Sequence, residues 1–188
     1  MNSDGWPSTT GVLKFFGLSG DYELFSNNTA MLRGRRVHAA CQLIGANLPF
    51  KEGWEANHLE CAPYLDAYRK FQREHRFHLL EYEQEYFCES LRFKSHPDQL
   101  GMLDDLDGLV NLELKSGSMP EWCRLQTAGQ VLAMNDPAIR RFGLQLKDDG
   151  NYQLYPHEDF RDLDRFRAMI DTYWTIQEFR NGDAISKQ

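Results

Sequence analysis

The sequence predicts an α/β or α+β domain in which helices flank a central mixed β-sheet. Over the first 76 residues, apolar side chains recur at intervals of three or four, a period typical of amphipathic helices. From His78 to Lys115 the period changes to two, which is typical of strands. A helix, two short strands and a final helix follow, and this order of elements favours a mixed sheet.

Length and composition fit one globular domain. The chain has 188 residues, 41% of them hydrophobic and 26% charged, which is enough to bury a substantial core. We expect a single domain over residues 1–188, mostly helical at 1–76, with the sheet core and a C-terminal helix at 77–188. No apolar run approaches the roughly 18 residues of a membrane-spanning helix, and no signal-peptide pattern is present. We therefore expect a cytoplasmic protein without membrane contact.

The N-terminal part is predicted to contain three helices. A Ser/Thr cluster after Pro7 can cap a short helix that runs to Phe16. A second helix is expected from about Asn28 to Ile44. The third has an apolar face made by Tyr64, Leu65, Tyr68 and Phe71, opposite a basic face made by Arg69, Lys70, Arg73 and Arg76.

Alternating residues predict the strands. The first run alternates Leu80, Tyr82 and Gln84 with Glu81, Glu83 and Glu85, and the next spans residues 91–94. In the clearest strand, residues 109–115, one face carries Val110, Leu112 and Leu114, and the other carries Asn111, Glu113 and Lys115. A helix at about 121–134, strands at 142–146 and 152–155, and a helix at about 159–179 complete the chain.

Glu113 and Lys115 lie two residues apart on one strand face, a spacing that suits phosphodiester hydrolysis. A carboxylate can bind Mg²⁺, and an ammonium beside it can orient the attacking water and offset transition-state charge. A hairpin turn at 104–108 would bring Asp98 level with Glu113 as a second metal ligand. Taken alone, Glu113 and Lys115 could also be an exposed ion pair without a catalytic role. Asp98 could also be a turn residue that follows Pro97.

The segment HPDQLGMLDDLDGLVNLELKSG, residues 96–117, resembles the core motif of the PD-(D/E)xK nuclease superfamily, most closely its RecB-like and phage-type exonuclease branch. In the same family a helix that carries a glutamine follows this motif, and residues 119–134, MPEWCRLQTAGQVLAM, resemble it. An upstream helix of the family carries a histidine, and residues 34–44, GRRVHAACQLI, resemble that helix. FGLQLKDDGNYQLYPHED, residues 142–159, and PSTTGVL, residues 7–13, extend the resemblance over nearly the whole chain. It implies a restriction-endonuclease-like core.

The resemblance also implies a metal site. Asp98 and Glu113 would ligate the catalytic ion, with the backbone carbonyl of Leu114 and the imidazole of His38 as further ligands. Such a mixed shell suits Mg²⁺ or Mn²⁺. Glu83 is a weaker candidate, because three alternating glutamates leave its register open.

Lys115 and Gln126 take catalytic roles in the same resemblance. Lys115 would position the attacking water, and Gln126 would orient Lys115 or the scissile phosphate. The chain departs from the family pattern at Ser95, where a small residue or glycine is usual, and at Gln130, where a tyrosine is common. The four cysteines form no Cys-x-x-Cys pair, and none lies beyond Cys123, so we expect buried thiols and no iron–sulfur cluster.

The net charge of −7 opposes DNA binding unless the charges are segregated. Candidate substrate-binding residues are Arg35 and Arg36, beside His38, and Arg124, near the motif. Divalent ions at the acidic cluster would reverse its local sign. The charges are therefore compatible with DNA held at one cleft.

The resemblance as a whole implies a Mg²⁺- or Mn²⁺-dependent deoxyribonuclease of DNA repair, recombination or phage and mobile-element DNA processing. An exonuclease is expected, although the sequence leaves exonuclease and endonuclease action both open. A homo-oligomer or a repair partner protein is compatible with it. Two alternatives stay open from the sequence. One is an accessory protein with the same fold that binds DNA ends, and the other is a protein-interaction surface formed by the glutamate-rich strand and residues 158–164.

Overall fold

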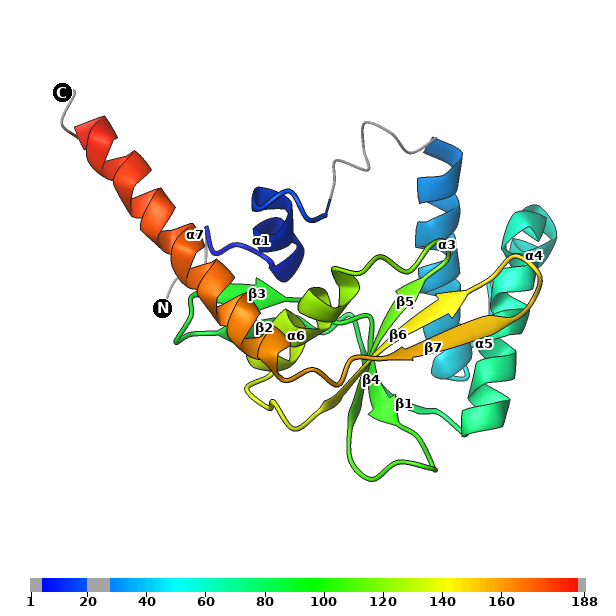
Figure 1. The fold of residues 1–188 in the computed structure, drawn as a ribbon. Helices are drawn as coiled ribbons and strands as arrows, with labels where there is room; N and C mark the ends of the chain where they lie inside the picture. Colours follow the sequence, from blue (N-terminus) through cyan, green and yellow to red (C-terminus); the bar gives the residue numbers. More distant parts are fainter. Residues whose placement is uncertain (1–4, 20–27, 186–188) are drawn as a thin grey trace.

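A five-stranded mixed β-sheet lies at the centre of the computed structural model, which describes residues 5–19 and 28–185 (Figure 1). The helices are α1 (Thr9–Phe15), α3 (Asn28–Gly45), α4 (Trp54–Asn57), α5 (Ala62–His75), α6 (Cys123–Ala133) and α7 (Arg161–Ile185), with a 3₁₀ turn at Leu59–Cys61. The strands are β1 (His78–Tyr82), β2 (Tyr86–Cys88), β3 (Phe93–Ser95), β4 (Gln99–Met102), β5 (Val110–Lys115), β6 (Arg140–Leu146) and β7 (Tyr152–Pro156). The predicted α+β class is confirmed.

The strand order of the main sheet is β1-β4-β5-β6-β7, and β2 and β3 form a separate two-stranded sheet. β4 and β5 are an antiparallel hairpin with Gln99 opposite Leu112. β5 and β6 are parallel, so the chain crosses between them through α6. One step beyond the Gln99–Leu112 pair, Asp98 is level with Glu113, as the sequence predicts.

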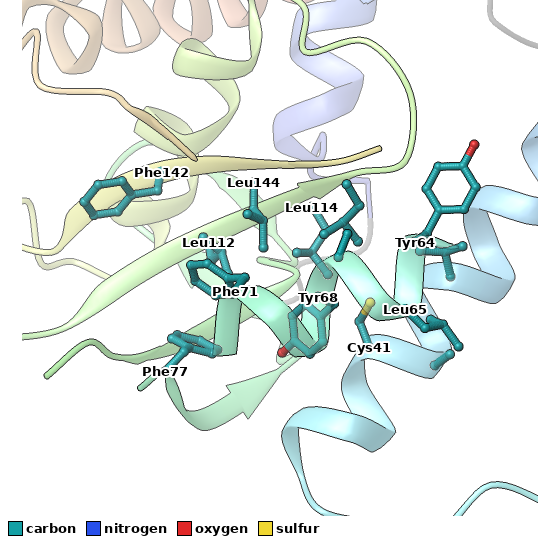
Figure 2. Close-up of a cluster of buried hydrophobic side chains, with 14 of the residues drawn as sticks. Cys41, Tyr64, Leu65, Tyr68, Phe71, Phe77, Leu112, Leu114, Phe142 and Leu144 are labelled. Carbon is teal, nitrogen blue, oxygen red and sulfur yellow. The ribbon is translucent and has the colours of Figure 1, made fainter. Parts of the chain in front are cut away.

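Apolar side chains cover both faces of the sheet. On one face, α3 and α5 pack against Leu112 and Leu114 of β5, and Figure 2 shows Tyr68 and Phe71 in this cluster. On the other face, α1, α6, α7 and the β2–β3 sheet enclose a second cluster. The four cysteines are buried and unpaired, which confirms the predicted buried thiols. Within residues 5–19 and 28–185, no helix is long and apolar enough to cross a membrane.

The three predicted N-terminal helices are confirmed, and their ends have local causes. Ser8 caps α1, because its hydroxyl accepts a 3.0 Å hydrogen bond from the backbone N–H of Gly11. α5 has Pro63 in its first turn and ends at Arg76, whose φ of 46° is left-handed. The predicted apolar face of α5 is buried.

The first predicted strand is too long. Its alternation extends to residue 85, but β1 ends at Tyr82 and the chain turns at Glu83, which has a φ of 46°. The backbone N–H of Glu83 bonds the carbonyl of Pro97 at 3.2 Å. The chain then leaves the main sheet, and β2 pairs with β3 instead. The alternation detected extended backbone on both sides of this turn but could not locate the turn itself.

Candidate active site

The polar face of β5 is buried beneath α6. Glu113 is only 2% exposed, so the exposed-ion-pair alternative is wrong. Because β5 is a central strand, its second face must be covered by a helix, and the parallel crossover places α6 there. α6 brings Gln126 and Gln130 to this face, and both are buried. The polar alternation of β5 therefore belongs to an interior polar cluster.

Glu113 is held by three donors. Its Oε1 accepts hydrogen bonds from Lys115 Nζ at 2.5 Å and from Gln126 Nε2 at 2.7 Å. Its Oε2 accepts one from Gln130 Nε2 at 2.6 Å. An ionised carboxylate has about four acceptor positions, so one position on Oε2 is left for a further partner.

Asp98 lies beside Glu113 and is anchored from two directions. Its Oδ2 accepts a 2.7 Å hydrogen bond from the backbone N–H of Leu114. Its Oδ1 is 3.5 Å from Nδ1 of His38, which α3 carries to the sheet. Within one strand residue the N–H and C=O point to the same side, so the Leu114 carbonyl lies on the same side of β5 as this N–H. The Asp98 carboxylate is therefore held in place by Leu114 and His38.

Neighbouring charges oppose the effect of burial on the pKa at Asp98 and Lys115 but add to it at Glu113. Burial raises the pKa of Glu113, and the charge of Asp98 adds to the rise. Burial alone would raise the pKa of Asp98, but His38 and Lys115 hold it below its ordinary value. Burial alone would lower the pKa of Lys115, but Glu113 and Asp98 raise it well above its ordinary value. The raised pKa favours the ammonium form of Lys115 at neutral pH.

Lys115 links the buried cluster to a pocket. Besides Glu113, it lies 3.3 Å from Oε1 of Gln126 and 5.6 Å from the centre of the Trp122 ring. The pocket has a volume of about 560 Å³ and is bounded by α3 and by the loop between β5 and α6. His38 and Lys115 both line it, so the polar cluster has an opening to ligands.

The predicted substrate-binding arginines do not all reach this pocket. Arg35 lines it. Arg36 instead bonds Glu60 at 2.9 Å. Arg124 faces Asp162, 3.5 Å away on α7. Glu83, the weaker candidate, lies on the pocket wall.

Gln130 is the site residue that sequence reasoning missed. Its place in the family pattern suggested a lost aromatic contact, but its side chain is 1% exposed and holds both Glu113 and Asn111. Gln126 and Gln130 are four residues apart, so they share one face of α6. That spacing, together with the polar face of β5, could have predicted that Gln130 belongs to the same polar cluster as Gln126.

The donors present fit a hard divalent cation. Asp98 and Glu113 offer carboxylate oxygens with free acceptor positions, Leu114 offers a carbonyl, and His38 offers an imidazole. Over the described ranges, no three His, Cys, Asp or Glu side chains already form a metal-binding group.

Neither models of known protein families nor curated protein sequences match this chain.

Proposed function

We propose that this chain is a metal-dependent nuclease that hydrolyses DNA phosphodiester bonds. The observation that carries the proposal is the convergence of Asp98, Glu113 and Lys115 at the end of one β-hairpin, beside an open pocket. The mixed sheet with α6 as its crossover is compatible with a restriction-endonuclease-like core. The resemblance to the PD-(D/E)xK superfamily supports the same assignment.

In the proposed site, Asp98 and Glu113 would hold Mg²⁺ or Mn²⁺, with His38 and the Leu114 carbonyl as further ligands. A divalent ion held by these residues would polarise the phosphate and lower the pKa of the attacking water. The ammonium of Lys115 offsets charge that develops on the phosphate oxygens. Gln126 bonds both Lys115 and Glu113, so it fixes their relative orientation.

Asp98→Asn is the sharpest first test, because it removes one ligand charge and nearly preserves side-chain shape. End-labelled linear DNA is incubated with the protein in Mg²⁺, Mn²⁺ or EDTA. We expect cleavage by the parent in either metal, no cleavage in EDTA, and at least a hundredfold loss in Asp98→Asn. Asp104→Asn is the matched control, since Asp104 is an exposed carboxylate that pairs with Arg76 and His78.

Absence of cleavage by the parent in both metals would refute the proposal. DNA binding without cleavage would favour the accessory DNA-end-binding protein instead. Equal activity in Asp98→Asn and Asp104→Asn would mean that a different site, or a contaminating nuclease, cuts the DNA.

A further inference from the structure

The pocket beside Lys115 has more room and more apolar wall than a phosphate needs. Met31, Ala39, Pro120 and Trp122 form the apolar part of its lining. Trp122 is half-buried, and the Lys115 ammonium lies 5.6 Å from its ring centre. The apolar wall therefore reaches the ammonium that the proposed mechanism places beside the reacting phosphate.

Cationic groups lie around the same pocket. Arg33 and Arg35 line it from α3, and the ammonium of Lys115 lies in the same lining. Among the described residues, the buried Nε of Arg33 has no hydrogen-bond partner, and the guanidinium lies 5.0 Å from the Tyr64 ring centre. Glu83 is the carboxylate on the wall. A flat apolar body with a negative charge complements this surface best, and a nucleotide is such a molecule.

The size and lining of the pocket decide between paired and unpaired DNA. A volume of about 560 Å³ lies in the range of sites for small organic ligands, roughly 300–1,000 Å³. A base inside a double helix is stacked on both faces and paired at its edge, so it has to leave the stack before it can lie against the Trp122 ring. Only a nucleotide that has left its pair can enter.

We propose that this pocket holds one unpaired nucleotide, with its base against Trp122, so that the protein acts on single-stranded DNA or on frayed ends. The inference rests on the proposed function, because the nucleotide next to the scissile phosphate is the one that enters. Base stacking on an aromatic ring tolerates any sequence, so no base preference is expected.

Binding in EDTA tests the pocket without cleavage. The probes are a fluorescent single-stranded thymidine oligonucleotide, a series in which one abasic site is moved along it, and a blunt duplex of the same length. Fluorescence anisotropy is measured for the parent, Trp122→Ala, Trp122→Phe and Phe160→Ala. Phe160 is 77% exposed and lies outside the pocket, so it is the matched aromatic control.

We expect the single strand to bind more tightly than the duplex, and one abasic position to weaken binding about five- to a hundredfold. Trp122→Ala should bind weakly and lose its sensitivity to that position, whereas Trp122→Phe and Phe160→Ala should retain it. An affinity that does not depend on the position of the abasic site would overturn the inference. The same loss of affinity at the abasic site in Trp122→Ala and in the parent would also overturn it. The nuclease proposal survives that result if the parent still cleaves DNA in Mn²⁺.

Discussion

Gln130 of α6 donates a 2.6 Å hydrogen bond to Oε2 of Glu113 and accepts one of 2.8 Å from Asn111, all in the interior of the protein. The bond leaves the Glu113 carboxylate little freedom to rotate. Gln130 is therefore a positioning residue for the proposed metal ligand, and its contribution can be separated from that of the ligand itself.

Gln130→Met keeps the side-chain length but removes both hydrogen bonds. We expect a loss of about 1–3 kcal/mol in the free energy of unfolding, because Glu113 and Asn111 lose a buried partner. The Mn²⁺ concentration for half-maximal cleavage should rise about tenfold or more. Urea unfolding and a metal titration of activity measure the two effects. An unchanged metal requirement would show that Gln130 only stabilises the fold.

His157 predicts a pH-dependent stability. Its burial and the charge of Arg141 lower the pKa of the imidazole from 6.5 to about 4. Between pH 6.5 and pH 4 the imidazole is protonated in the unfolded chain but mostly neutral in the folded chain. The free energy of unfolding therefore falls as the pH is lowered through this range.

Comparison with His157→Gln isolates this contribution from the carboxylates that titrate in the same range. From pH 7 to pH 4 the parent should lose about 1–3 kcal/mol more stability than the variant. Urea unfolding at pH 4, 5, 6 and 7 measures the difference. Parallel curves for the two proteins would contradict a buried neutral imidazole.

Gly101 permits the close approach of β1 to β4. A Cβ at this position would lie 2.5 Å from the backbone carbonyl of His78 and equally close to the Phe77 ring. We expect Gly101→Ala to lower the free energy of unfolding by about 1–3 kcal/mol, because these neighbours have to move. Gly117→Ala is the control, since its Cβ would meet no atom within 4 Å. Similar melting temperatures for the two variants would show that β1 can shift freely.

The arginines differ in their expected effect on DNA binding. Arg35 is exposed and lines the pocket, whereas Arg124 is held near Asp162 and Asp159. Arg35→Ala should weaken DNA binding several-fold at low salt and reduce its salt dependence. Arg124→Ala should have a smaller effect on binding. Fluorescence anisotropy over a series of salt concentrations tests this order, and a larger effect of Arg124→Ala would reverse it.

Much of the site could be predicted from the sequence, because it depends on local periods. The alternation along β5 separated Glu113 and Lys115 from Leu112 and Leu114, and the hairpin turn set the level of Asp98. The contact of His38 with Asp98 came from the resemblance, since no local pattern connects α3 with β4.

Other features depend on tertiary packing and could not be predicted. Whether the polar face of β5 meets solvent or a helix depends on the crossover of α6, which no residue of β5 encodes. The turn at Glu83 is stabilised by the carbonyl of Pro97, which is distant in sequence. The partners of Arg36 and Arg124 lie on other elements, so their charges alone suggested a role in substrate binding.

Lys115→Ala tests the central claim most directly, because Lys115 is the proposed transition-state cation. The cleavage rate of end-labelled linear DNA in Mn²⁺ is compared for the parent, Lys115→Ala and Lys147→Ala. Lys147, in the turn after β6, is the matched control, because it bonds Gln153 away from the site. The account predicts at least a hundredfold loss in Lys115→Ala and a parental rate in Lys147→Ala. Cleavage by Lys115→Ala at the parental rate would contradict it.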